Sequence, residues 1–165
     1  MKRLELHLDS LRVNRPPSPV APKSVSGELY FGMELFDFPE KGWYERVSST
    51  LDMWLMEISS FILKKSDICT LYFMDGPFQI KLRHHGVNGI VVDFFENYRK
   101  IHSMTLEMGL DEFHVFLQSV TVCTEHYIEG CRTMTEEIDS IEGVGRILDQ
   151  VRIIEKYLKD ITDMP

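Results

Sequence analysis

Hydrophobic and polar residues alternate at the start of the chain. Leu4, Leu6 and Leu8 are separated by charged or polar residues, and this period of two places the leucines on one face of a β-strand. The pattern predicts a first strand over residues 4–13. Four prolines follow it, and because proline cannot donate a backbone hydrogen bond, we expect residues 15–24 to form a loop.

The next segments change from the period of a strand to the period of a helix. Residues 28–36 are rich in aromatic side chains and predict a second strand. Over residues 43–65, hydrophobic side chains recur every three or four positions, which is the spacing of one face of a helix. The spacing predicts that Trp54 lies on the buried face, whereas polar residues such as Ser48 and Asp52 fill the outer face.

Four short hydrophobic runs follow the predicted helix. The dipeptide Asp75-Gly76 separates the first two runs, and Asp-Gly between hydrophobic runs is typical of a hairpin turn. Short strands joined by short turns predict an antiparallel meander. The four predicted strands are residues 68–74, 78–82, 89–96 and 100–107.

The C-terminal third predicts two helices. A long helix begins near Leu110, and its buried stripe runs from Phe113 to Cys131. In the last segment, hydrophobic residues are spaced by four, three, four and three positions, which resembles two heptads of a coiled coil. This stripe predicts either core packing of a terminal helix or a homodimer. Its members are Ile147, Val151, Ile154, Leu158 and Ile161.

These elements together predict an α+β fold. We expect an antiparallel sheet of about six strands, packed by two to three amphipathic helices. A length of 165 residues suits a single domain spanning residues 1–165.

Charge is distributed unevenly along the chain. The formal net charge is −8, and the stretch from Glu107 to Glu142 carries all of it, with nine acidic residues and one basic residue, Arg132. Such a segment either forms a solvated face or attracts a basic protein partner. The candidate partner-binding residues are Glu125, Glu129, Glu136, Glu137, Asp139 and Glu142.

The same charge balance argues against several classes of partner. Nucleic acids and anionic membranes attract basic surfaces. The longest run without Asp, Glu, Lys or Arg, residues 113–124, is shorter than the ~18–20 residues that span a bilayer. Charged residues also occupy positions where a signal peptide would be apolar. We therefore expect a cytoplasmic protein that binds neither nucleic acid nor membrane.

The spacing of possible metal ligands and of glycines gives no support for a metal site or a cofactor site. His84 and His85 are adjacent on a predicted strand, so their side chains face opposite sides. His114 and His126 lie twelve residues apart on a helix, which separates them by about 18 Å of rise. No phosphate-binding or dinucleotide-binding glycine motif is present. We expect no bound metal and no organic cofactor.

Candidate catalytic residues are equally isolated. Asp93 and Glu96 are three positions apart on a predicted strand, so their carboxylates diverge, and we expect both to be solvated near the strand end. Cys69, Cys123 and Cys131 form no C-x-x-C pair and predict buried free thiols. The sequence therefore favours a protein without catalytic activity.

Short aromatic and turn motifs in residues 27–82 resemble a known family. They are Gly27-Glu28-Leu29-Tyr30, then Phe38-Pro39-Glu40 with Trp43, then Trp54-Leu55, and the hairpin from Leu71 to Phe78. Together they resemble small bacterial immunity-type proteins encoded beside polymorphic or contact-dependent toxins.

The resemblance implies a cytoplasmic inhibitor that binds one toxin domain and occludes its active or substrate surface. The matching residues belong to the expected core and turns, so the resemblance assigns no functional residue. Two other interpretations remain open: an adaptor or structural protein in another complex, and a small enzyme.

Overall fold

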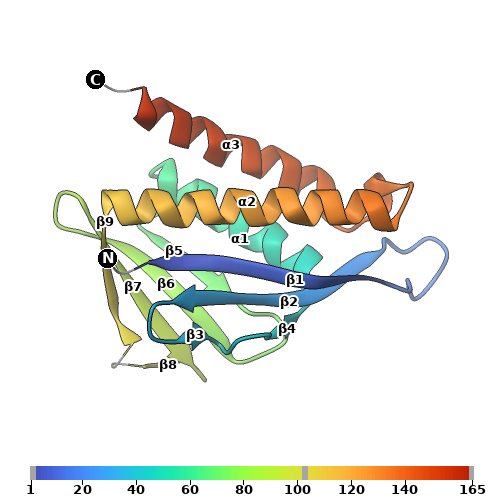
Figure 1. The fold of residues 1–165 in the computed structure, drawn as a ribbon, viewed down its shortest axis with the longest axis horizontal. Coiled ribbons are helices and arrows are strands. Elements are labelled where there is room, and N and C mark those ends of the chain that lie inside the picture. The colour runs from blue at the N-terminus through green and yellow to red at the C-terminus, as the bar shows by residue number, and fades with distance from the viewer. Residues whose placement is uncertain (1–2, 102–103, 164–165) are drawn as a thin grey trace.

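The computed structural model describes residues 3–101 and 104–163, which form two antiparallel sheets and three α-helices (Figure 1). The first sheet has the order β1–β2–β3, and β4 also pairs with β2. The proline-rich segment connects the two long strands of this sheet. Its strands are β1 (Leu4–Asn14), β2 (Ser24–Met33), β3 (Asp37–Phe38) and β4 (Tyr44–Glu45).

The second sheet contains the predicted meander. Its order is β5–β6–β7–β8, and β9 also pairs with β7. The strand predicted over residues 100–107 is divided, because one strand ends at Lys100 and the next begins at Leu106. The chain turns before the first of these at Asn97 and Tyr98, which both have positive φ angles. The strands are β5 (Ile68–Tyr72), β6 (Phe78–His85), β7 (Gly89–Glu96), β8 (Arg99–Lys100) and β9 (Leu106–Gly109).

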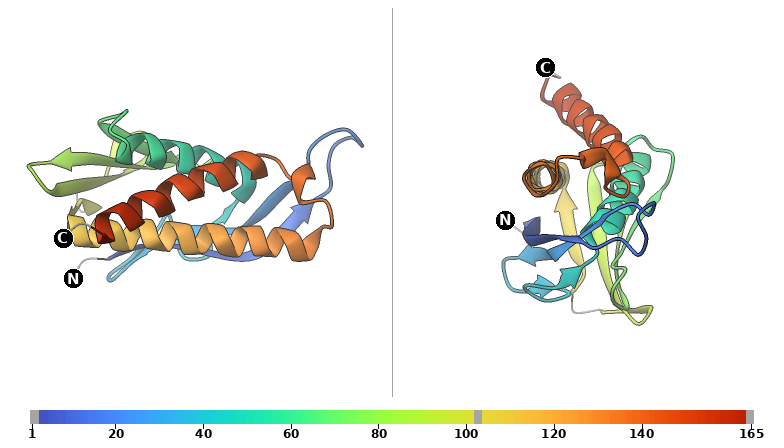
Figure 2. Two further views of the ribbon diagram at one scale, coloured as in Figure 1. Left: turned by 90° about the horizontal axis from the view of Figure 1, so that it is seen from above. Right: turned by 90° about the vertical axis from the view of Figure 1, so that its right-hand side faces the viewer.

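The helices lie together on one side of the sheets (Figure 1). Seen from above, α3 lies over the space between α1 and α2 (Figure 2). The predicted α+β class is confirmed, although the strands form two sheets where we expected one. The helices are α1 (Val47–Ile62), α2 (Leu110–Met134) and α3 (Val144–Thr162), and a 3-10 turn, η2 (Ile138–Ser140), connects the last two.

Aromatic rings fill the space where the two sheets and α1 meet. Phe38 of the first sheet lies 5.0 Å from Phe94 of the second, measured between ring centroids. Trp54 of α1 stacks on Phe31 at 5.0 Å and meets Phe73 edge-on at 4.9 Å. Trp54 is 1% exposed, so the prediction that it lies on the buried face is confirmed.

Side chains from the helices form hydrogen bonds with backbone groups at the open edge of each sheet. At the edge of the second sheet, the indole nitrogen of Trp54 donates to the carbonyl of Tyr72 at 2.7 Å. At the edge of the first, the amide of Leu6 donates to Ser119, and the thiol of Cys123 donates to the carbonyl of Leu6. Unpaired backbone groups on an edge invite pairing with other chains, and these contacts occupy some of them.

The outer face of α1 differs from its prediction. Ser48 and Asp52 are buried, because strand β2 and helix α3 cover positions that we expected to face solvent. Ser48 accepts a hydrogen bond from the amide of Val25, and Asp52 pairs with Arg146 of α3. Helix α1 is therefore covered at these positions too, and its exposed residues are Met56 and Glu57.

The hydrophobic stripe of the last helix packs largely against other parts of the same chain. Ile147, Val151 and Ile154 are buried, whereas Leu158 and Ile161 are half-buried. The first half of α3 therefore has its stripe covered by α1 and α2, in agreement with core packing of a terminal helix.

Replacing Trp54 by alanine should destabilise the fold strongly. Trp54→Ala removes a large buried ring and leaves the carbonyl of Tyr72 without its indole donor, so we expect a loss of about 3–5 kcal/mol. Chemical denaturation monitored by circular dichroism measures this loss. Met56→Ala on the same helix is the control, because Met56 is 47% exposed and should shift the midpoint little. Equal midpoints for Trp54→Ala and the parent would contradict the packing described here.

Candidate functional site

The six predicted partner-binding residues lie at three places around α2 and α3. Glu125 and Glu129 are exposed on α2 and line a groove against α3. Glu136, Glu137 and Asp139 are exposed on the connection between the two helices. Glu142 is half-buried and accepts a hydrogen bond from Ser49 of α1 at 3.1 Å. The structure therefore brings these residues to one region without gathering them into one cluster.

The groove between α2 and α3 has a volume of about 350 Å³. In Figure 1, α3 runs back above α2 and rises from it toward the C-terminus. The floor of the groove is formed by Ile128 of α2 and Val151 of α3, which are buried, and by half-buried Leu148. The groove thus combines an apolar floor with charged rims.

Both acidic and basic side chains line the rims of the groove. Arg132 pairs with Glu129 at 3.5 Å, and Arg152 pairs with Asp149 at 3.4 Å. Glu155 of α3 also lines the groove. Counting charges along the sequence did not reveal this mixture of signs. Arg152 and Glu155 of α3 lie outside the acidic stretch in the sequence and come next to it only in the folded structure.

The connection is more uniformly acidic than the groove. Lys23 lies 3.9 Å from Glu137 and also donates a hydrogen bond to Thr135. The loop before β2 touches the connection as well, because Lys23 forms a parallel bridge with Ile141. The connection is therefore held by its backbone, while the carboxylates of Glu136, Glu137 and Asp139 are exposed.

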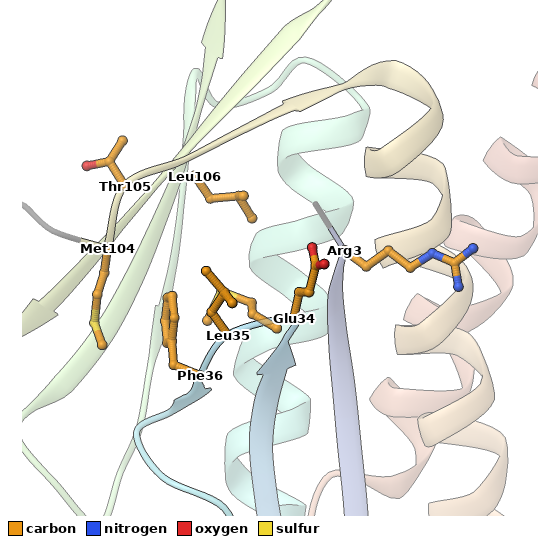
Figure 3. A pocket seen from close by; sticks show the side chains of 8 residues that line it. Arg3, Glu34, Leu35, Phe36, Met104, Thr105 and Leu106 are labelled. Carbon is orange, nitrogen blue, oxygen red and sulfur yellow. The ribbon is translucent and has the colours of Figure 1, made fainter. Parts of the chain in front are cut away.

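A smaller cavity lies where the end of β2 approaches β9. Its volume is about 230 Å³, below the ~300–1,000 Å³ of typical small-molecule pockets. Figure 3 shows Leu35, Phe36 and Met104 around it, while the guanidinium of Arg3 points away from them. Leu35 is 90% exposed, so this cavity is a shallow apolar depression with few polar groups to orient a ligand.

The cysteines and histidines have structural surroundings. Cys69 and Cys131 are buried and Cys123 is half-buried, and all three are free thiols, as predicted. Burial raises the pKa of each thiol, to about 11 for Cys123, which disfavours the nucleophilic thiolate form. His84 stacks on Phe61 with ring centroids 4.3 Å apart. Within residues 3–101 and 104–163, no three His, Cys, Asp or Glu side chains are grouped as metal ligands.

The prediction that Asp93 is solvated is wrong. It is buried on β7 and accepts hydrogen bonds from Lys100 at 2.6 Å, from Thr105 at 3.1 Å and from Arg83 at 3.4 Å. Burial alone would raise the pKa of Asp93, but these hydrogen bonds and the charge of Lys100 outweigh it and lower the pKa. Glu96 is exposed, so the two carboxylates do not share a site.

Comparisons with models of protein families, with curated proteins and with solved structures find no match to this chain. Among the described residues, no helix has the length and apolar character needed to cross a bilayer.

The low pKa of Asp93 predicts a pH-dependent contribution to stability. A carboxylate whose pKa is lower in the folded state stabilises the fold above its unfolded pKa of about 3.9, and this stabilisation is lost as the pH falls through the folded value. Asp93→Asn should therefore cost about 1–3 kcal/mol at pH 7, because Lys100 and Arg83 lose their anionic partner.

Denaturation of the parent and of Asp93→Asn at pH 7 and at successively lower pH measures this contribution. The gap between the two midpoints should narrow as the pH falls below about 4. Glu96→Gln, on the same strand but exposed, is the control and should show no such gap. A gap that stays constant down to pH 2 would contradict the role given to Asp93.

Proposed function

We propose that this chain is an immunity-type binding protein of the bacterial cytoplasm. It neutralises a cognate toxin domain by covering that domain's active or substrate surface and catalyses no reaction itself. The observation that carries the proposal is the set of exposed carboxylates on the α2–α3 connection, Glu136, Glu137 and Asp139. Of the described basic residues, only Lys23 lies within ion-pair distance of any of these three.

The position of these carboxylates supports a role in binding. Charges that were needed for stability would have partners within the fold, as Asp93 and Asp52 have. Among the described residues Glu136 and Asp139 have no such partner, and Glu137 has only Lys23 at 3.9 Å, so these exposed carboxylates repel one another and direct their field to the solvent. A basic partner relieves that repulsion, so the connection suits the first encounter with a basic toxin domain.

The resemblance over residues 27–82 supports the role in a different way. These residues run from β2 through α1 to β6 and contribute most of the aromatic core. They account for a common scaffold, whereas the acidic surface lies on a separate part of the chain. The scaffold and the binding surface can therefore change independently, which suits inhibitors that each match a different toxin.

Neutralising the connection should slow association with the toxin domain. The variant carries Glu136→Gln, Glu137→Gln and Asp139→Asn, and the partner is the C-terminal domain of a large secreted protein encoded next to this chain. Stopped-flow kinetics at low salt should show association about tenfold slower or more, with a smaller change in dissociation, because steering acts on encounter. The difference should shrink near 0.1 M salt, where the Debye length falls to about 10 Å.

A matched variant separates local steering from total charge. Glu34→Gln, Glu40→Gln and Glu96→Gln remove the same number of negative charges from exposed positions away from the connection, so association should slow much less. Equal slowing by both triple variants would show that only net charge matters. An unchanged rate for the connection variant, or no binding of the toxin domain to the parent, would contradict the proposal.

A further inference from the structure

We propose that the groove between α2 and α3 receives an amphipathic helix from the partner, with an apolar stripe flanked by lysine or arginine. This inference rests on the proposed function, because it names the second contact of the same surface. The connection supplies long-range attraction, whereas a lasting complex needs buried apolar contact as well. The groove lies directly beside the connection, between the two helices that the connection joins.

The floor of the groove has the spacing that a helix recognises. Leu148 and Val151 are one turn apart on α3, and Ile128 faces them from α2. A partner helix presents apolar residues at the same three- and four-residue intervals. The cavity of about 350 Å³ holds a few side chains of such a stripe, so the occupant inserts its side chains and leaves its backbone outside the groove.

The charges on the rims select a basic helix over an acidic one. Both arginines of the groove already have acidic neighbours, at 3.5 Å for Arg132 and Glu129 and at 3.4 Å for Arg152 and Asp149. Glu125 of α2 and Glu155 of α3 have no such ion-pair partner among the described residues. Two carboxylates therefore face the groove from opposite walls, where cations beside an apolar stripe would meet them.

The partner helix would extend the helical layer. Helix α3 already packs on both α1 and α2, and the new helix would lie on the side of α3 away from α1 (Figure 2). Packed helices lie about 8–10 Å apart, so side chains of the partner would reach Leu148 and Val151 without displacing α3. Binding in this position needs no opening of the core.

The test uses a fluorescein-labelled peptide of about five helical turns, roughly 18 residues, with a leucine stripe flanked by lysines. Two further peptides serve as controls: one with glutamate in place of every lysine, and one with the same composition in scrambled order. Fluorescence anisotropy measures binding of each peptide to the full chain at low and at moderate salt. The basic peptide should bind at least about tenfold more tightly than either control. Only this peptide has both an apolar stripe for the floor of the groove and basic residues for the carboxylates on its rims.

Variants of the groove locate the binding site on the protein. Glu125→Lys with Glu155→Lys reverses two exposed rim charges and should weaken the basic peptide about tenfold or more while strengthening the acidic one. Leu148→Gln makes the floor polar and should weaken the basic peptide without reversing the preference. Because both changes are at exposed or half-buried positions, unchanged circular dichroism and denaturation midpoints should show that the variants fold.

The connection variant with Glu136→Gln, Glu137→Gln and Asp139→Asn is the control for general attraction. At moderate salt, where this attraction is screened, its peptide affinity should change by less than about threefold. Equal binding of the three peptides, absence of binding, or groove variants that bind like the parent would each overturn the inference. If the toxin domain binds but the basic peptide does not, the groove inference fails and the proposed function stands. If the peptide binds through the groove but no toxin domain binds, the proposed function fails and the groove remains a helix-binding site.

Discussion

The buried carboxylate of Glu45 holds the two sheets and the first helix in one arrangement. Glu45 is 0% exposed and accepts hydrogen bonds from Thr50 of α1 at 2.8 Å, from the indole of Trp43 at 3.1 Å, and from the amides of Met74 and Asp75. Burial raises the pKa of Glu45, and the hydrogen bonds from Thr50 and Trp43 only partly offset this effect. A buried carboxyl is tolerated where its oxygens are bonded, and here the bonding groups come from the first sheet, from α1 and from the hairpin of the second sheet.

Fixing α1 in this way also fixes the surface that we associate with binding. Asp52 on the far side of α1 receives hydrogen bonds from Arg146 of α3 at 2.5 to 3.1 Å. Gly143, just before α3, has a φ of 74°, and a Cβ there would lie 2.9 Å from the carboxylate of Asp52. The first turn of α3 thus packs closely against α1, and this contact fixes the position of the groove and the connection.

The sequence predicted what depends on local periodicity and failed where distant segments meet. The helix carrying Trp54, the stripe of α2 and the hairpin around Asp75 follow from spacing alone, and the structure contains all three. The sequence predicts a solvent-exposed Asp52, because nothing in its own helix indicates that Arg146, 94 residues later, will cover it. The prediction of a solvated Asp93 is also wrong, because its partners Arg83 and Lys100 come from the strands on either side of β7. Counting charge finds the acidic residues but not the groove, because the walls of the groove come from two helices, α2 and α3, that meet only in the folded chain.

Hydrogen exchange of the bound protein shows whether α2, its connection to α3 and α3 itself form the binding surface. The measurement compares amide exchange of this chain alone and in complex with the C-terminal domain of the neighbouring secreted protein. We predict that exchange slows in the second half of α2, in the connection and in α3, and stays unchanged in β5, β6 and β7. Slowed exchange confined to the strands of the second sheet, with none at the connection or in α3, would contradict it.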